Sequence, residues 1–274
     1  MTPTAKSLIL ELLVAASGDA LPVRLAVAAA ALFDISQNNV RVALVRLSSA
    51  GLIEAAGRGA YRLAEAAEDL AREVASWRTA EERVRAWHGD YVAVHASALG
   101  RTDRTALKRR ARSLSMLGFA ELERGLHLRP DNLEGGVEGV RTRLHALGLE
   151  REATVFVASA LSPSDEARAR DLWDGKALTA SYKRQRVQLE RWMARARDLE
   201  PDVAARESFL LGGNAIRQIV YDPLLPPPFV DVDERRAFVA TVRQMDREGR
   251  RIWRRFFDFS DAQGALAPEV ADVH

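Results

Sequence analysis

Between residues 36 and 51 the apolar positions recur with the period of an α-helix. They follow the spacing i, i+3, i+4 and i+7 and comprise Val40, Ala43, Leu44 and Leu47. This spacing predicts an amphipathic helix with one buried stripe. Ser36 is a favourable N-cap before it, and Gly51 can adopt the left-handed conformation that ends a helix.

The opposite face of this helix carries amides and arginines and no acidic side chain. Amide and guanidinium groups near a helix N-terminus can hydrogen-bond base edges and phosphates in a major groove. We therefore interpret the segment as a DNA-recognition helix, although a short helix on an ordinary protein surface can also carry Asn and Arg. The residues that we expect to contact DNA from this helix are Gln37, Asn38, Arg41, Val42 and Arg46.

The segments on either side favour the DNA-binding interpretation. Residues 52–63 form two short β-prone runs around Gly57-Arg58-Gly59, which predicts a hairpin with Arg58 at its tip, placed to contact phosphate. Two helices are expected earlier in the chain, over residues 4–16 and 22–32, with Pro22 at the first helical position. Three helices followed by a hairpin are the order of a winged helix-turn-helix domain, which we assign to residues 1–66.

The period of the pattern changes twice in the following hundred residues. Residues 67–89 continue a helical connector, and residues 90–160 alternate strands and helices in the order β-α-β-β-α-β. The second helix of this region is expected to begin at Pro130-Asp131-Asn132 and to end at Gly148. This order is that of a ferredoxin-like domain.

Residues 161–257 are predicted to form a helical C-terminal domain. Gly212 and Gly213 fall inside one helix, where each costs about 1 kcal/mol relative to Ala, so either a close helix crossing or room for a ligand should compensate. The last helix, residues 233–257, carries many arginines on one face, which is typical of a solvated surface but also suits phosphate groups. The candidate ligand-binding residues are Gly212, Gly213, Arg217, Arg250 and Trp253. Residues 258–274 are expected to be a flexible tail.

Composition narrows the possible functions. The 274 residues suggest two or three domains, and the net charge of +2 excludes a protein that is basic over its whole surface. Cysteine is absent, which excludes disulfides, a thiol nucleophile and a thiolate zinc site. No signal peptide and no apolar stretch of roughly 20 residues is found. These observations lead us to expect a soluble, cytoplasmic protein.

The sequence offers little support for catalysis. A metal-dependent nuclease on a ferredoxin-like fold would need a carboxylate near the end of the first strand, whereas residues 92–97 contain none and the next acidic residue is Asp103. The five histidines show no metal-ligand spacing, and no Gly-rich phosphate loop or nucleophile elbow is present. We therefore expect no catalytic residue, no metal and no cofactor, although a Cas2-like nuclease is kept as an alternative.

Three stretches of the chain resemble the PaaX family, repressors of phenylacetate catabolism. They are residues 39–47 with the hairpin 57–63, residues 117–119 with 125–133, and residues 222–227. The resemblance implies an α+β protein with an N-terminal winged helix, a ferredoxin-like middle domain similar to Cas2 and a helical C-terminal domain. It also implies a homodimer that leaves its double-stranded DNA operator when phenylacetyl-CoA binds. The chain departs from the family in a short link between its first two helices and in His127, where a tryptophan is expected, and the second departure bears on the effector.

The sequence thus predicts a DNA-binding transcriptional regulator, a repressor released by an aryl- or acyl-CoA effector. A winged-helix regulator controlled by a protein partner is the alternative, with the C-terminal helices as its interaction surface.

Overall fold

The computed structural model describes residues 2–16, 18–100 and 102–266, with residues 66, 69, 70 and 261–266 described by their backbone alone. The chain forms two compact units. Unit 1 comprises Met1–Ala75, Arg191–Asn214 and Gln244–His274, and unit 2 comprises Ser76–Glu190 and Ala215–Arg243. Residues 161–257 contribute to both units.

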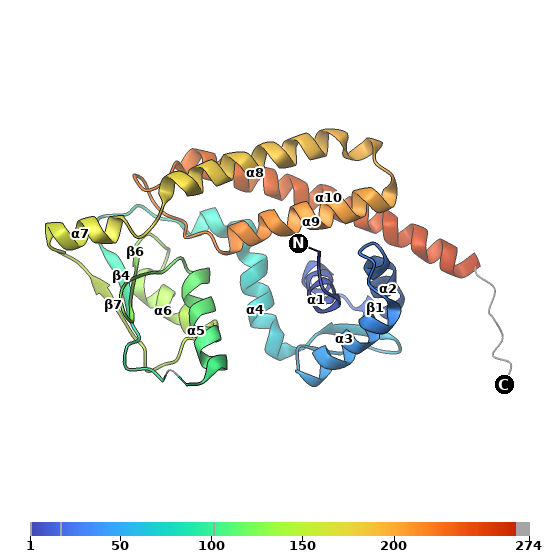
Figure 1. Cartoon of the computed structure of the whole chain (residues 1–274), viewed down its shortest axis with the longest axis horizontal. Helices are drawn as coiled ribbons and strands as arrows, with labels where there is room; N and C mark the ends of the chain where they lie inside the picture. The colour runs from blue at the N-terminus through green and yellow to red at the C-terminus, as the bar shows by residue number, and fades with distance from the viewer. Residues whose placement is uncertain (1, 17, 101, 267–274) are drawn as a thin grey trace. The chain divides into compact units, whose positions relative to one another are not determined.

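The first part of unit 1 contains three helices and a small sheet (Figure 1). The helices are α1 (Ala5–Ala16), α2 (Val23–Ala31) and α3 (Gln37–Ser49). Strands β1 (Leu21–Pro22), β2 (Ile53–Ala55) and β3 (Ala60–Leu63) pair antiparallel in the order β1-β3-β2. Pro22 precedes α2 as its N-cap and belongs to β1, so its expected place as the first helical residue is corrected.

The remainder of unit 1 consists of α4 (Glu65–Ala75) and parts of three long helices. These are α8 (Gly175–Arg195), α9 (Pro201–Val220) and α10 (Val232–Leu266), and a 3-10 turn, Ala196–Asp198, follows α8. Phe209 of α9 and Trp253 of α10 pack against the core of the three N-terminal helices. The rings of Phe33 and Phe209 lie 5.3 Å apart. The C-terminal helices therefore complete the hydrophobic core of the N-terminal region.

Unit 2 is built on a four-stranded antiparallel sheet. Its elements follow the order β4 (Tyr91–His95), α5 (Arg104–Met116), β5 (Ala120–Glu123), β6 (Leu126–Pro130), α6 (Gly136–Ala146) and β7 (Thr154–Ala158). The strands lie in the order β5-β6-β4-β7, so the first strand in sequence is central and is flanked by the third and the fourth.

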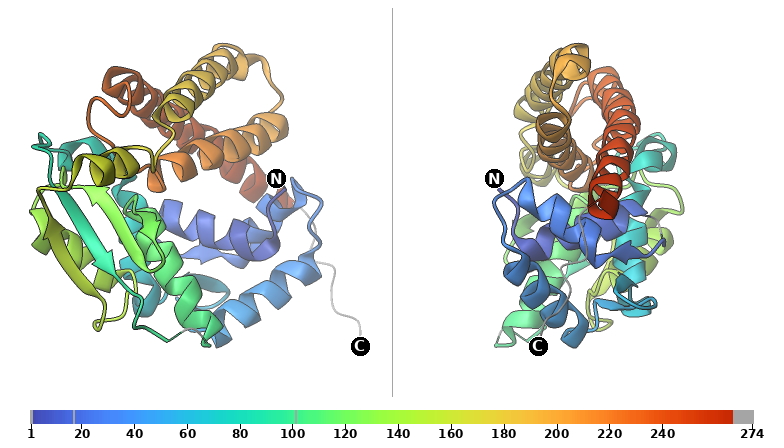
Figure 2. Two further views of the ribbon diagram at one scale, coloured as in Figure 1. Left: turned by 60° about the vertical axis from the view of Figure 1, so that its left-hand side comes forward. Right: turned by 90° about the vertical axis from the view of Figure 1, so that its right-hand side faces the viewer.

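Helices pack on both faces of this sheet (Figure 2). Helix α7 (Pro163–Arg170) places Ala169 against Tyr91, Ala93 and Leu128, which point to one face. Helices α5 and α6 cover the other face. Tyr91, Val92, Ala93 and Val94 are all fully buried, as a central strand covered on both sides requires.

Three element boundaries differ from the predicted ones. The connector helix ends at Ala75 and is followed by a 3-10 segment, Ser76–Arg83, that is interrupted at Thr79. Helix α6 starts at Gly136 rather than at 130–132, because Gly135 and Gly136 both have positive φ angles and delay the helix. Helix α10 continues to Leu266, so residues 258–266 of the expected flexible tail are helical, and residues 267–274 lie outside the described residues. Within the described residues, no helix combines the length and apolarity needed to cross a membrane.

Candidate nucleic-acid interface

Helix α3 has the cap and the buried stripe that its sequence predicts. The Ser36 hydroxyl accepts a hydrogen bond from the Asn39 backbone N–H at 3.3 Å, and Gly51 ends the segment with a φ of 66°. The buried residues of the helix are Val40, Ala43, Leu44 and Leu47, which pack in the core with α1 and α2. Because this stripe fixes the rotation of the helix, the opposite face points to solvent.

The solvent face of α3 carries the predicted DNA-contacting residues. Gln37, Asn38, Arg41 and Arg46 are exposed, and Val42 is 39% exposed. The helix contains no acidic residue, so neither base edges nor phosphates would meet a carboxylate on it. Its N-terminus also carries the positive end of the helix dipole, which favours phosphate.

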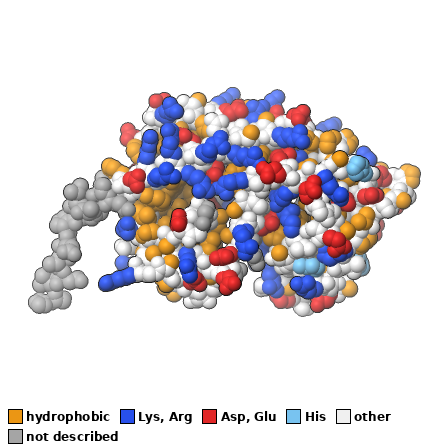
Figure 3. Space-filling model, turned by 180° about the vertical axis from the view of Figure 1, so that it is seen from behind, with side chains coloured by type: hydrophobic (Ala, Val, Ile, Leu, Met, Phe, Trp, Pro, Cys, Tyr) orange, Lys and Arg blue, Asp and Glu red, His pale blue; other side chains and the backbone are white. Residues whose placement is uncertain are grey.

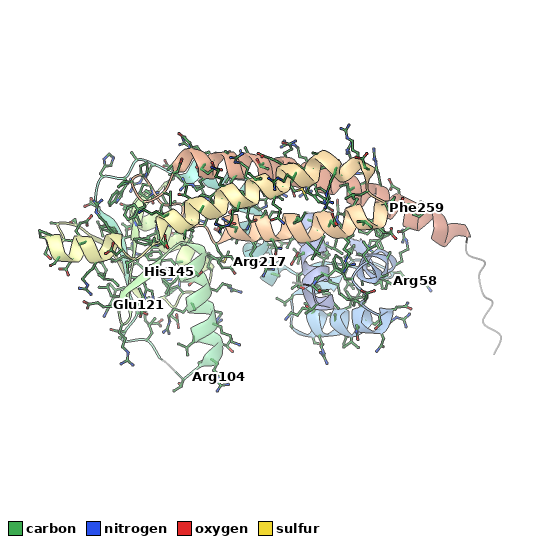
Figure 4. All side chains as sticks on the ribbon, turned by 45° about the horizontal axis from the view of Figure 1, so that its top comes forward. Arg58, Arg104, Glu121, His145, Arg217 and Phe259 are labelled. Atoms are coloured by element: carbon green, nitrogen blue, oxygen red, sulfur yellow. The ribbon has the colours of Figure 1, made fainter. Side chains whose placement is uncertain are left out.

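The β2–β3 hairpin presents one arginine at its tip. Arg58 is exposed and lies between Gly57 and Gly59, whose φ angles of 99° and 69° shape the turn (Figure 4). The Ala56 backbone N–H donates to the carbonyl of Ala60 at 3.0 Å and closes the loop. Arg62 of the same hairpin instead forms an ion pair with Glu54 at 2.6 Å. Arg58 is thus better placed than Arg62 to meet a phosphate.

Four of the five predicted ligand residues belong to unit 1 and pack near the N-terminal helices. A Cβ on Gly213 would lie 3.4 Å from the Glu11 carboxylate of α1, and a Cβ on Gly212 would lie 3.9 Å from Met245 of α10. Both distances are ordinary van der Waals contacts with side chains, so close packing of helix backbones does not require glycine at either position.

The aromatic and basic members of the predicted set are also engaged. Trp253 stacks edge-on with Phe209 and Phe256, at ring distances of 5.9 and 5.5 Å. Arg250 donates to the carbonyl of Ala15 at 3.2 Å and pairs with Asp246. Arg217 lies on α9 in the part assigned to unit 2 (Figure 4). The structure therefore brings Gly212, Gly213, Arg250 and Trp253 into one unit and assigns Arg217 to the other.

Two of the stretches that carry the family resemblance meet in a buried polar cluster of unit 2. The Arg129 guanidinium donates to the Asn132 side chain at 2.9 Å and to the carbonyls of Leu117 and Pro223. The Asn132 amide donates to the carbonyl of Leu224 at 2.7 Å. Burial lowers the pKa of Arg129 to about 9, which leaves the guanidinium charged at pH 7. These motif residues therefore hold the chain together rather than face a ligand.

Gly118, from the 117–119 stretch, is required by the same contact. Its φ is +71°, and a Cβ there would lie 2.4 Å from the Pro223 Cα. The Trp173 indole N–H also donates to the Gly118 carbonyl at 3.3 Å. Only glycine fits both the backbone conformation and the approach of residue 223.

One arginine of the predicted basic face of α10 is buried, which corrects that expectation. Arg235 is 1% exposed, donates to Glu81 at 2.7 Å and to the carbonyl of Leu225 at 2.6 Å. Burial of this arginine is tolerated because the carboxylate and the carbonyl satisfy it. Other basic side chains gather along the surface of α10 (Figure 3), and the exposed arginines include Arg247, Arg254 and Arg255. Residue spacing alone could not identify Glu81, since it lies 154 residues away.

Unit 2 also has an open hollow of about 460 Å³ beside α5 and α8. Its wall is largely apolar and aromatic, with Asp174 as the charged residue and no Lys or Arg among the described lining. The lining residues are Ser115, Gly118, Phe119, Ala120, Leu172, Trp173, Asp174, Ala177, Leu178, Ser181, Tyr221 and Pro223. None of the predicted ligand residues lines it. The hollow suits an apolar group but offers no cation for phosphates.

Asp103, the first acidic residue after β4, has a structural role. Asp103 caps α5, where its side chain accepts the backbone N–H groups of Thr105 at 2.7 Å and Ala106 at 3.2 Å. These two hydrogen bonds, that from Ala106 first, hold the pKa of Asp103 below its usual range. Across the described residues, no group of three or more His, Asp or Glu side chains is arranged to hold a metal ion.

Comparisons with known proteins give the chain a family and a fold. An uncharacterized protein from Mycobacterium tuberculosis, Rv0674, has a similar structure, with a TM-score of 0.58 and 24% sequence identity over 94% of this chain and 99% of that one. No curated protein matches the sequence. Two family models do match, the PaaX-like protein model over residues 4–67 and the PaaX-like protein C-terminal domain model over residues 173–255. The chain therefore belongs to the PaaX-like family, whose members are in general transcriptional regulators of phenylacetic acid degradation rather than enzymes.

Proposed function

We propose that this chain is a sequence-specific DNA-binding repressor in which α1, α2, α3 and the β2–β3 hairpin form a winged helix-turn-helix. In this proposal unit 2 contains a ferredoxin-like domain, which its strand order β5-β6-β4-β7 supports. The observation that carries the function is the composition of the solvent face of α3, which presents both amide and arginine side chains and no acidic residue.

The roles of the individual side chains follow from the chemistry of DNA. Asn38 and Arg41, in the first turns of α3, are the base-reading candidates, since amides match adenine and guanidinium groups match guanine. Arg46 and Arg58 are the phosphate candidates, and phosphate contacts add affinity without sequence information. Gln37 and Val42 complete the contact set.

The first experiment measures specificity. Binding sites are selected from random DNA with the full chain, and affinities for the selected site and for random DNA are compared by fluorescence anisotropy. Arg41→Ala should cost ~1–3 kcal/mol on the selected site and relax the preference at one base pair. Equal losses on both DNAs would make Arg41 a phosphate contact, and failure to select any sequence would refute the function.

The second experiment tests the hairpin through salt. Each lost phosphate contact should lower the salt slope of binding by roughly one, so Arg58→Ala should show this change. Arg62→Ala is a matched control, since Arg62 is paired with Glu54 in the same hairpin. An unchanged slope in Arg58→Ala would remove the hairpin tip from the interface.

A homodimer is part of the proposal, because one recognition helix reads too few bases for a genomic operator and HTH proteins usually solve this by two-fold symmetry. Light scattering at micromolar concentration gives the test. A monomer mass that persists with the selected site bound would contradict it.

The effector is proposed to be an aryl- or acyl-CoA, such as phenylacetyl-CoA, that weakens operator binding. Arg250 is exposed on α10 and could meet CoA phosphates, and Gly212, Gly213 and Trp253 belong to the same unit, whereas Arg217 is exposed on the part of α9 that belongs to unit 2. Phenylacetyl-CoA should lower operator affinity, while free CoA and phenylacetate should do so poorly. If no thioester of a panel changes the affinity at millimolar concentration, control by a protein partner replaces the effector proposal.

A further inference from the structure

The centre of the solvent face of α3 is apolar. Val42 and Val45 are 39% and 63% exposed, whereas the other apolar residues of the helix are at most 7% exposed. They lie one turn apart, at i and i+3, between the exposed arginines Arg41 and Arg46. Val45 is therefore an exposed apolar side chain in the middle of the face that the proposed function directs at DNA.

Folding of unit 1 gives no reason for valine at these two positions. An exposed β-branched residue disfavours a helix relative to alanine, because its side chain loses rotamer freedom against the preceding turn. The core that holds α3 is supplied by Val40, Leu44 and Leu47 on the other side. The two valines are therefore candidates for a contact outside the described fold.

The chemistry of the surrounding face indicates which partner supplies that gain. The two arginines and the absence of acidic residues in α3 favour a polyanion over a second protein surface. In the major groove of DNA, the apolar group on the base edges is the C5-methyl of thymine. We infer that Val45, supported by Val42, contacts a thymine methyl and so adds a thymine to the sequence that the protein recognises. This inference rests on the proposed DNA-binding function and extends it to one base.

Replacement of thymine by uracil isolates this contact, since it removes the methyl group and leaves base pairing intact. In the selected site each dT is replaced by dU, one position at a time, and affinity is measured with the full chain. At one or two positions the wild-type affinity should fall by about threefold to tenfold, the size expected for losing one buried methyl contact. Val45→Ala should weaken binding to the thymine site by a similar factor. In this variant, the loss of affinity caused by replacing dT with dU (the dU penalty) should vanish at that position.

Val203→Ala provides the matched control, because Val203 is also an exposed valine of unit 1, at 42%, but lies on α9. This variant should keep the full dU penalty. Circular dichroism checks that Val45→Ala is folded, which the higher helix propensity of alanine favours.

Three outcomes would overturn the inference, and they are distinguishable. If no dU position loses its penalty in Val45→Ala while Arg41→Ala still loses specificity, the valine contact is wrong and the DNA-binding function stands. If Val45→Ala instead lowers the molar mass in light scattering without that coupling, the valines belong to a contact between copies of the chain. If the chain selects no sequence at all, the proposed function fails together with the inference.

Discussion

Arg129→Met removes the central donor of the buried polar cluster in unit 2. The Arg129 side chain is 1% exposed and donates to the Pro130 carbonyl at 3.1 Å, the Asn132 side chain at 2.9 Å, the Pro223 carbonyl at 3.4 Å and the Leu117 carbonyl. Methionine is flexible and fills irregular space in a core, so the change tests hydrogen bonds more than a cavity.

The expected loss is set by two opposing terms. Each buried acceptor left without a donor costs about 1–3 kcal/mol, and the variant leaves several of them. Removal of the buried charge offsets part of this loss of stability, since burying an ion costs several kcal/mol. The partners of Arg129 are neutral carbonyl and amide oxygens, so the substitution leaves no uncompensated charge, and we expect a net loss of about 1–3 kcal/mol of stability. The melting temperature should then fall by roughly 2–12 °C.

The assay is unfolding by urea, followed by circular dichroism, with a thermal melt alongside. Arg168→Met is the control, since it makes the same change in unit 2 at an arginine that is 49% exposed and paired with Glu123. A surface pair of this kind contributes about 0–1 kcal/mol. If Arg129→Met is as stable as Arg168→Met, the hydrogen bonds of Arg129 contribute no net stability, and the proposed stabilising role of the buried polar cluster is refuted.

Three further predictions test other parts of the fold. Gly212→Ala should raise stability by about 1 kcal/mol in thermal melts, because Met245 at 3.9 Å leaves room for a methyl group, whereas Gly118→Ala should destabilise the protein strongly. A Gly212→Ala protein that loses its effector response instead would support the ligand explanation. A fragment of residues 1–66 should melt at a lower temperature than the full chain and without a sharp transition, because it lacks the Phe209 and Trp253 side chains that cover its core. A sharp transition at the melting temperature of the full chain would contradict this prediction. Burial lowers the pKa of His127 below its unfolded value of about 6.5, so its contribution to stability is present above pH 6.5 and is lost as the pH falls through the lowered folded value. Between pH 7 and pH 5, His127→Gln should therefore lose less stability than the wild type in urea titrations. A loss equal to that of the wild type would exclude His127 as the cause.

Helix α3 could be predicted because its signals are local. The cap at Ser36, the stripe ending at Leu47 and the glycine at 51 lie within sixteen residues, and each acts on the backbone beside it. The hairpin could be predicted for the same reason, because Gly57 and Gly59 form the turn within a few residues of the strands that it joins. For the same reason the β-α-β-β-α-β order agrees with the observed sequence of elements.

The predictions that failed depended on partners far away in the chain. Arg235 was predicted to lie on the solvated arginine face of the last helix, but it is buried, because its guanidinium bonds Glu81, 154 residues away in the chain. Asn132 was read as a helix start, whereas its side chain bonds the Leu224 carbonyl across 92 residues. Strand β1 was missed because two residues carry no periodicity, and it exists only through pairing with Tyr61 and Ala60. Such contacts leave no local pattern to detect.

The composition of unit 1 bears directly on how the proposed DNA binding could be regulated. Phe209 and Trp253 are partly buried against the same core that fixes the rotation of α3, and Arg250 bonds the end of α1. A ligand can shift an equilibrium only by the difference in its affinity for the two states. A ligand that changes the packing of α9 or α10 within unit 1 would therefore act on the core beneath α3 itself. Because the helices that carry Gly212, Gly213 and Trp253 are already part of that core, such coupling requires no signal between the two units.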